Sequence, residues 1–263
     1  MGDKKLYFTI DLDWIPGSEQ SMGGIFKLIE TYNIKPTFFF TGKFAQNYPE
    51  ILSECVLKKY QIGNHGWAHG KDSNENFGSD VNIDIQRKLL YQSMEVIEKI
   101  SGIRTNIFRA PRMKISDTTF KVLSELDYQI DSSIASKRFD LGFGSINSLK
   151  HFQLPQQPYY IHKPGMNNNI LEIPPSAFFL PLNMRLLRTF NFVIINKILN
   201  NIEKNTDSIV FYLHPTEFVV ANKMEIPKGE NMNFYKNCSP KNFEKLEYFI
   251  QTVLNRKYEF NYM

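Results

Sequence analysis

Short apolar runs alternate with stretches of helical periodicity along most of the chain. Residues 6–12 are apolar on both faces, as in a strand covered on both sides, and similar runs follow at 37–41 and 61–64. Between the first two runs, apolar residues recur at helical spacing over residues 25–32, and Pro36 ends this helix. This alternation predicts an α/β fold with a parallel sheet, which we expect to close into a barrel.

The same alternation continues toward the C-terminus. Further strands are predicted at residues 106–109, 128–131, 170–174 and 208–213, and further helices around residues 90–97, after Ser116, at 186–202 and from Ser239 onward. A chain of 263 residues suits one α/β barrel, so residues 1–263 are predicted to form a single domain.

One long stretch, residues 136–170, has no such periodicity and is rich in Pro, Gly, Asn and aromatic residues. Its aromatic residues include Phe139, Phe143, Phe152, Tyr159 and Tyr160. Loops of this length in a compact domain are usually functional, so we expect an ordered excursion that either seals the barrel or lines its mouth.

Charge, hydropathy and cysteine usage exclude several classes of protein. The net charge of +4 is mild and no block of Lys or Arg interrupts the sequence, so no nucleic-acid partner is predicted. No stretch approaches the roughly 18 apolar residues of a membrane span, and no signal-type segment is seen. Cys55 and Cys238 lie far apart, which fits a reduced compartment. A cytoplasmic location is therefore predicted.

Two of the five histidines lie four residues apart in the segment Asn64 to His69. If this segment forms a helical turn, His65 and His69 fall on one side and can bind one metal ion. The same spacing also suits two ordinary polar loop residues. A catalytic site would need a carboxylate from elsewhere, and the best donor is Asp11 or Asp13 at the end of the first strand.

Several polar residues end or follow predicted strands at the C-terminal side of the strand. These residues are Asp11, Asp13, His65, Arg109, Asp131 and His214. In a parallel barrel the C-terminal ends of the strands share one face, where active sites are built. The sequence therefore predicts that these side chains converge.

The residue types indicate how such a site would work. Asp11 and Asp13 point the same way on an extended backbone, so one can bind a metal while the other takes a proton from water. Arg109 is expected to pair with one carboxylate and hold it ionised, unless it is a surface cation. His214 lies at a strand end before Pro215 and can act as a general acid, although a structural histidine would also fit there.

These motifs resemble those of the polysaccharide deacetylases, carbohydrate esterase family 4. The matching segments are Thr9–Asp13, Thr37–Gly42, His65–His69, Arg109–Pro111, Tyr128–Ser133 and Leu213–Pro215, within about residues 6 to 218. The resemblance implies a distorted (β/α)7 barrel. Residues 170–176 and 216–218 resemble a subgroup that acts on exopolysaccharide or peptidoglycan-type substrates. The chain departs from the commoner pattern where Leu12 separates the aspartates and where Gly66 replaces a Ser or Thr.

The resemblance also implies a role for each site residue. It implies Asp11 as the base, Arg109 as the residue that orients this base, His214 as the acid, Asp131 in the motif that tunes the histidine, and Asp13, His65 and His69 as metal ligands. The implied metal is divalent, with Zn²⁺ as first choice. The implied reaction is metal-assisted hydrolysis of an N-acetyl group on a polysaccharide or glycan precursor.

Three other functions stay open. A hydrolase of a non-sugar amide or ureide would use the same barrel. A non-haem iron oxygenase also binds its metal through two histidines and one carboxylate, but its carboxylate normally lies close to one histidine, whereas here the two histidines are paired. A catalytically silent carbohydrate-binding relative would need neither Asp11 nor His214.

Overall fold

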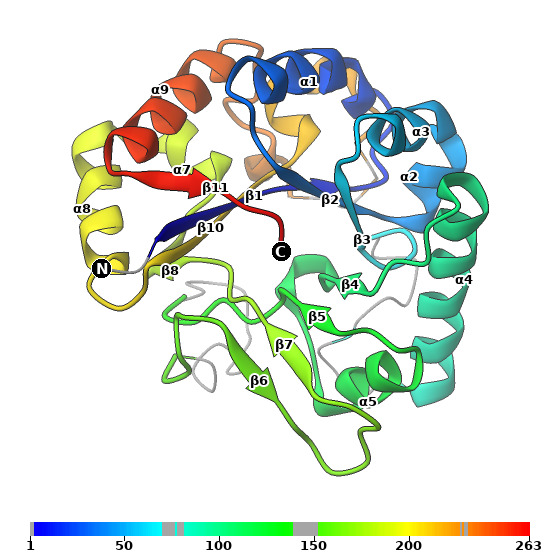
Figure 1. Cartoon of the computed structure of the whole chain (residues 1–263). Helices are drawn as coiled ribbons and strands as arrows, with labels where there is room; N and C mark the ends of the chain where they lie inside the picture. Colours follow the sequence, from blue (N-terminus) through cyan, green and yellow to red (C-terminus); the bar gives the residue numbers. More distant parts are fainter. Residues whose placement is uncertain (1–2, 70–76, 78–81, 139–151, 227, 229–230) are drawn as a thin grey trace.

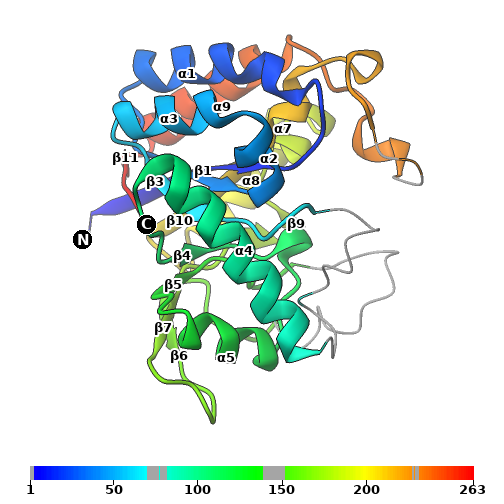
Figure 2. The same ribbon diagram turned by 90° about the vertical axis from the view of Figure 1, so that its right-hand side faces the viewer.

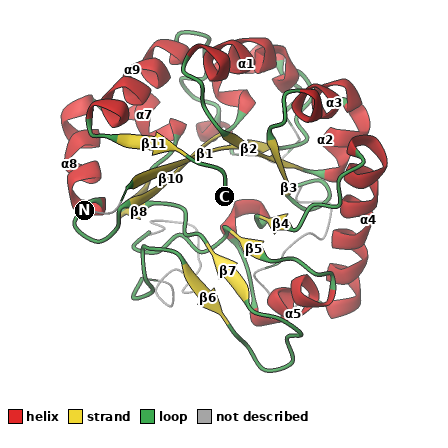
Figure 3. Ribbon diagram, in the orientation of Figure 1, coloured by secondary structure: helices red, strands yellow, loops and turns green. Residues whose placement is uncertain are grey.

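The structure is a computed structural model, and it describes residues 3–69, 77, 82–138, 152–226, 228 and 231–263. At its centre lies a strongly curved sheet with helices along its outer side (Figure 1 and Figure 3). Around the curve of the sheet, seven parallel strands of the described residues follow one another, and an eighth, short parallel strand near the C-terminus pairs beside the first of the chain. The seven lie in the spatial order β10 (Ser208–Leu213), β1 (Lys4–Leu12), β2 (Pro36–Phe40), β3 (Gln61–Asn64), β4 (Ile107–Phe108), β5 (Ile130–Asp131) and β7 (Ile170–Glu172). The prediction of a distorted (β/α)7 barrel is confirmed.

Helices follow the strands along the chain, as the periodicity predicts. They are α1 (Met22–Thr31), α2 (Gly42–Asn47), α3 (Pro49–Leu57), α4 (Ile83–Ser101), α5 (Asp117–Glu125), α7 (Met184–Thr189), α8 (Phe192–Ile202) and α9 (Asn242–Asn255). The short 3-10 helices are η1 (Ser18–Ser21), η3 (Pro111–Met113), η4 (Pro215–Phe218), η5 (Ala221–Lys223) and η6 (Met232–Phe234). None of the helices in the described part of the chain is long and apolar enough to cross a membrane.

The barrel closes between β7 and β10 without a continuous ladder. Strand β6 (Tyr159–Ile161) pairs antiparallel with β7 and ends the sheet on that side. After β7, the Ser176 N–H donates to the Val210 carbonyl at 3.2 Å, and Ser176 Oγ accepts from the Val210 N–H at 3.0 Å. The chain then forms the hairpin of β8 (Ala177–Phe178) and β9 (Leu180–Pro181). Beyond the hairpin, Asn183 forms an isolated parallel bridge with Tyr212 of β10. Closure through such isolated contacts explains why the barrel is distorted.

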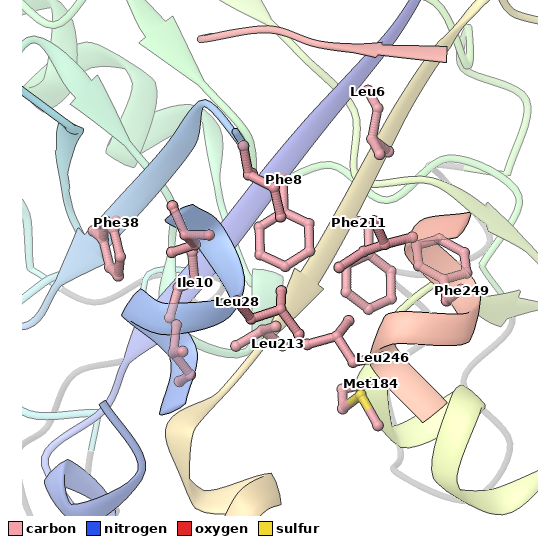
Figure 4. Packing of buried hydrophobic residues seen from close by; sticks show 14 of the residues in the cluster. Leu6, Phe8, Ile10, Leu28, Phe38, Met184, Phe211, Leu213, Leu246 and Phe249 are labelled. Atoms are coloured by element: carbon pink, nitrogen blue, oxygen red, sulfur yellow. The ribbon is translucent and has the colours of Figure 1, made fainter. Parts of the chain in front are cut away.

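Successive side chains of β1 and β10 point alternately toward the outer helices and toward the barrel interior. The residues that pack against the helices are Leu6, Phe8, Ile10, Leu12, Ile209, Phe211 and Leu213 (Figure 4). The Phe211 ring stacks on Phe249 of α9 with centroids 4.5 Å apart. Burial of each large side chain contributes roughly 1.5–3 kcal/mol, so this layer fixes which residues face the helices. The residues between them in the strand, such as Tyr7 and Thr9, therefore face the interior.

The first described residue, Asp3, and the C-terminus lie at the end of the barrel where β1 begins (Figure 2). At that end strand β11 (Tyr258–Phe260) pairs with the first residues of β1. The last residue, Met263, packs near Tyr7 and Val210. The C-terminal ends of the parallel strands lie at the opposite end, which leaves that face to the predicted site.

Two predicted helix boundaries are wrong. The helix expected over residues 186–202 is two helices, because Asn191 interrupts it and its side chain accepts the Ile194 N–H at 3.2 Å, which caps α8. The last helix begins at Asn242 rather than at Ser239, because a turn in which the Asn242 N–H donates to the Ser239 carbonyl precedes it.

The aromatic stretch that was expected to be irregular contains β6. Within it Tyr159 is half-buried and Tyr160 is 71% exposed. Phe139 and Phe143 lie outside the described residues. A sealing or groove-lining role for this stretch stays a prediction.

Candidate active site

Strand pairing brings Asp11 and His214 to the same place on the interior face. The ladder of β1 and β10 pairs Ile10 with Leu213, so the residues that follow emerge side by side. His214 Nε2 lies 3.9 Å from Asp11 Oδ2 and 3.8 Å from Asp13 Oδ2. The structure therefore brings the side chains of the first and last motifs together, as predicted.

A loop, and not a helical turn, brings the two histidines together. Strand β3 ends at Asn64, whose Oδ1 accepts the Gly66 N–H at 2.8 Å and the Ser93 hydroxyl at 2.9 Å. Gly66 has a φ of +75°, in the left-handed region that glycine adopts without strain. The chain turns back at this point, and the His65 and His69 ring centroids lie 5.4 Å apart. The expectation of a helical turn is wrong, because the Asn64 side chain stabilises this turn instead.

Asp13, His65 and His69 form a compact cluster of possible metal ligands. One ligand atom from each lies within 4.8 Å of the others. The Nε2 atoms of His65 and His69 are 3.4 Å and 3.9 Å from Asp13 Oδ1. Asp13 Oδ1 and His65 Nε2 are buried, and neither has a hydrogen-bond partner among the described residues. Buried polar atoms are nearly always satisfied, so these two atoms suit a position that a cation would fill.

The protonation of His65 also fits a metal ligand. Its Nδ1 lies 2.7 Å from the Arg109 carbonyl oxygen, which can only accept, so Nδ1 carries the proton and, in the neutral ring, the Nε2 lone pair points toward Asp13. His69 Nε2 accepts the Arg112 N–H at 3.2 Å, a contact that a cation bound to this nitrogen would replace. Two imidazoles and one carboxylate are a donor set of catalytic zinc sites, so the residues present fit a divalent cation.

Arg109 holds Asp11 from inside the barrel. Its fully buried guanidinium donates from Nη1 to Asp11 Oδ1 at 2.8 Å and to Thr9 Oγ1 at 2.7 Å. Its Nε and Nη2 donate to the carbonyl and hydroxyl of Ser132 at 3.0 Å and 2.8 Å. The guanidinium also lies over the Phe39 ring, 4.3 Å from its centroid. These contacts fix Asp11 Oδ1 and leave Oδ2 directed into the site.

His214 lies between carboxylates on two sides. Its Nδ1 is 3.7 Å from Glu217 Oε2, while its Nε2 faces Asp11 and Asp13. Burial alone would lower the pKa of His214, but the nearby Glu217, Asp13 and Asp11 outweigh burial and raise the pKa to about 9. A ring with this pKa carries a proton at neutral pH, as a general acid must.

The same charges act on the candidate metal ligands. Burial would raise the pKa of Asp13, but His69, His65 and His214 outweigh it and hold that pKa well below its usual value. Burial would lower the pKa of His65, and the two neighbouring aspartates raise it overall. Burial is the main cause of the lowered pKa of His69. Asp13 is therefore ionised, which metal binding requires.

Asp131 does not join this group, because it faces the other side of the sheet. Its neighbour Ile130 packs toward the interior cluster, so alternation turns Asp131 and its register partner Glu172 toward the outer face. The Asp131 carboxylate accepts from the Ser133 hydroxyl at 2.6 Å and from the Ser133 N–H at 3.2 Å. Within the described ranges no contact joins Asp131 to His214. A catalytic role for Asp131 stays a prediction that no contact supports.

Sequence reasoning assigned no role to Thr9, Ser132 or Glu217, although all three contact site residues. Glu217 Oε2 accepts the backbone N–H of His214 at 3.0 Å. A carboxylate three residues after a strand-end residue is a common capping pattern, and this spacing is the signal that would have identified Glu217.

One family profile matches the first half of the chain. The profile described as polysaccharide deacetylase matches residues 1–130. A peptidoglycan-N-acetylglucosamine deacetylase of Bacillus cereus is 26% identical over 102 residues, which cover 39% of this chain and 35% of that protein. The matched residues thus span about a third of that relative.

Two solved structures share the fold over nearly the whole chain. A Mycobacterium smegmatis protein assigned to the polysaccharide deacetylases superposes with a TM-score of 0.65 at 16% identity, over 100% of this chain and 88% of that one. A carbohydrate esterase family 4 pseudoenzyme of Bacillus anthracis superposes with a TM-score of 0.58 at 12% identity, over 98% and 63%. At these identities the likeness shows the fold alone.

Proposed function

The chain belongs to the polysaccharide deacetylase family, and from this premise we propose that it hydrolyses N-acetyl groups of an N-acetylated saccharide. One observation carries the proposal. The ligand atoms of Asp13, His65 and His69 converge beside Asp11 and His214, so a candidate metal cluster, base and acid share one face of the barrel. The Bacillus cereus relative, named for an N-acetylated sugar of peptidoglycan, supports this class of substrate.

The candidate cluster of Asp13, His65 and His69 would hold a divalent cation, with zinc as first choice. A cation bound there would polarise the acetyl carbonyl and make water a better nucleophile at neutral pH. The orientation of His65, fixed by the Arg109 carbonyl, keeps one ligand lone pair in place before any metal arrives.

The remaining side chains supply proton transfer. Asp11, with one oxygen fixed by Arg109, offers the other oxygen to accept a proton from the attacking water. His214, protonated at neutral pH, donates a proton from Nε2 to the leaving amine. Base and acid lie within 3.9 Å of one another, so both reach a single scissile bond.

Metal content and acetate release together test the proposal. The zinc-loaded chain should bind about one zinc and release acetate from N-acetylglucosamine oligomers. His65→Ala and His69→Ala should lose both properties. His162→Ala is the matched control, because this exposed histidine bonds Asn169 at 2.9 Å and lies outside the cluster. Full zinc retention in both cluster variants would refute the metal assignment.

The substrate panel separates the competing functions. A zinc-loaded chain that releases no acetate from any N-acetylated sugar, but hydrolyses a ureide, would be an amide hydrolase on the same barrel. Zinc binding without hydrolysis of either class would identify a catalytically silent relative. Both outcomes would contradict sugar deacetylation.

A further inference from the structure

Within the proposed deacetylation, on which this inference rests, we infer that Glu217 is the residue that positions His214 to donate its proton. Neither the motif comparison nor the strand-end pattern gives Glu217 this role. The inference depends on three observations: the contacts of Glu217 with His214, the buried cation that anchors Glu217, and the outward orientation of Asp131.

Glu217 contacts both the backbone and the ring of His214. Its Oε2 accepts the His214 N–H at 3.0 Å and lies 3.7 Å from ring Nδ1, while ring Nε2 faces Asp11 and Asp13. The 3.7 Å separation is longer than a hydrogen bond, so in this structure the carboxylate attracts Nδ1 by charge. A carboxylate at Nδ1 keeps a proton on that nitrogen, so Nε2 is the nitrogen that releases its proton.

A buried cation anchors Glu217 from the other side. Arg188 of α7 donates from Nε to Glu217 Oε1 at 3.3 Å, and the two side chains are only 3% and 5% exposed. The remaining Arg188 nitrogens donate to the carbonyls of Lys236 and Phe234. The Glu217 carbonyl accepts from the Asn242 side chain at 2.7 Å. Arg188 of α7 thus holds the Glu217 carboxylate, and the start of α9 holds the Glu217 backbone.

Asp131 does not contact or orient His214 among the described residues. It lies on the outer face of β5, and Ser133 uses both of its oxygens. Glu217 reaches His214 from η4, directly after β10, because three residues of tight turn bring its side chain back to the strand end. The chain therefore supplies the orienting carboxylate from the histidine's own loop.

A purely structural Glu217–Arg188 ion pair is the alternative, and it predicts a different result. Loss of a structural pair would lower thermal stability and would act equally on every substrate. Loss of a positioning residue would act on the step in which His214 gives up its proton. Substrates whose leaving group needs no proton separate the two cases.

Glu217→Gln keeps the side-chain shape and removes the charge. In the zinc-loaded full chain we expect kcat for an N-acetylglucosamine tetramer to fall about 10- to 100-fold with little change in KM. Hydrolysis of 4-nitrophenyl acetate, whose leaving phenolate needs no proton, should fall far less. Glu217→Asp, which keeps the charge, should restore part of the loss. Glu203→Gln is the matched control, since it removes a partly buried ion pair with Arg256 far from His214.

The ¹⁵N resonances of the His214 ring provide a readout that needs no turnover. At a pH where the ring is neutral, we expect the proton on Nδ1 in the wild type and a mixture of tautomers in Glu217→Gln. An unchanged tautomer, or equal losses on amide and ester, would overturn the positioning role. If the wild type releases no acetate but the tautomer shift is present, the proposed function fails and the positioning of His214 by Glu217 stands.

Discussion

Two pairs of buried carboxyl groups lie on opposite faces of one sheet, and the groups around the two pairs differ. Asp11 and Asp13 lie on the interior face at the end of β1, whereas Asp131 and Glu172 are register partners on the outer face of β5 and β7. All four residues are at most 8% exposed. The pKa of Asp13 lies well below its usual value, while burial raises the pKa of both Asp131 and Glu172.

The neighbouring cations, and not the depth of burial, cause this difference. The interior pair faces the Arg109 guanidinium, 2.8 Å from Asp11, and three imidazoles. The outer pair mainly faces itself, so burial and the charge of Asp131 both raise the pKa of Glu172. Glu172 Oε2 is buried and has no hydrogen-bond partner among the described residues. A proton on Glu172 that is shared with Asp131 would satisfy this oxygen.

The comparison shows that a carboxyl group at a strand end is not by itself a base or a ligand. What the structure shows is that Asp13 is held ionised where the sheet turns it toward the imidazoles of His65, His69 and His214. The face on which the carboxyl group lies therefore decides its chemistry.

The largest expected effect comes from Asp11→Asn, which removes the proton acceptor of the interior pair and keeps its shape. Turnover should fall about 10²- to 10⁴-fold. Zinc content, measured by elemental analysis, should stay unchanged because Asp11 lies outside the ligand cluster. Near wild-type acetate release would mean that Asp11 is a structural partner of Arg109.

The next largest effect is expected from Arg109→Leu, which removes the interior cation and should lower the free energy of unfolding. It leaves Asp11 buried without its partner, which typically costs about 3–5 kcal/mol in the free energy of unfolding. Urea denaturation measures this loss. Arg87→Leu is the control, because Arg87 is 39% exposed in its ion pairs and should change stability by less than about 1 kcal/mol. Equal losses of stability in the two variants would mean that the buried Arg109 stabilises the fold no more than the surface Arg87.

A smaller effect is expected from Glu172→Gln on the outer face. Because the pKa of Glu172 is raised in the folded state, its stabilising effect is fully present below the ordinary value of about 4.3 and is lost as pH rises through the folded pKa. Wild-type stability should fall over that window by up to about 1.4 kcal/mol per pH unit. The Gln variant should lose this slope in urea titrations. An unchanged slope would mean that Glu172 is ionised in the folded protein.

The smallest effect is expected from Tyr159→Phe beside the outer pair. The Tyr159 hydroxyl is buried and, within the described residues, has no hydrogen-bond partner. Its removal should change the free energy of unfolding by less than about 1 kcal/mol, the usual net value of one hydrogen bond. A larger loss would show that this hydroxyl donates to Glu172.

Sequence periodicity predicted the seven strands that curve around the barrel, because these strands are buried apolar runs with their own turn signals, but it missed the short strands β6, β8, β9 and β11. Gln61–Asn64 and Ser208–Leu213 have the predicted bounds. The placement of Asp11 and His214 at one edge followed from parallel strands alone. Arg109 was likewise expected to pair with an aspartate, and the structure shows that pair with Asp11.

The face of each strand-end residue could not be predicted in the same way. Strands β4 and β5 are only two residues long, so no alternating pattern indicates which way Asp131 points. The turn at His65 depends on Ser93, which comes from a helix later in the chain. Glu217 is fixed by Arg188, 29 residues earlier, and local spacing carries no information about that contact.

The guanidinium of Arg109 also determines how the barrel interior can assemble. Its partners Thr9 and Asp11 lie 100 and 98 residues earlier in the chain, and the Tyr212 ring, 5.8 Å away, comes from near the other end. These contacts close loops of about a hundred residues, and contacts between residues so far apart in sequence form later in folding than those of a strand and its adjacent helix. The interior face is therefore built from residues near both ends and the middle of the chain, and neither half of the chain alone can form it.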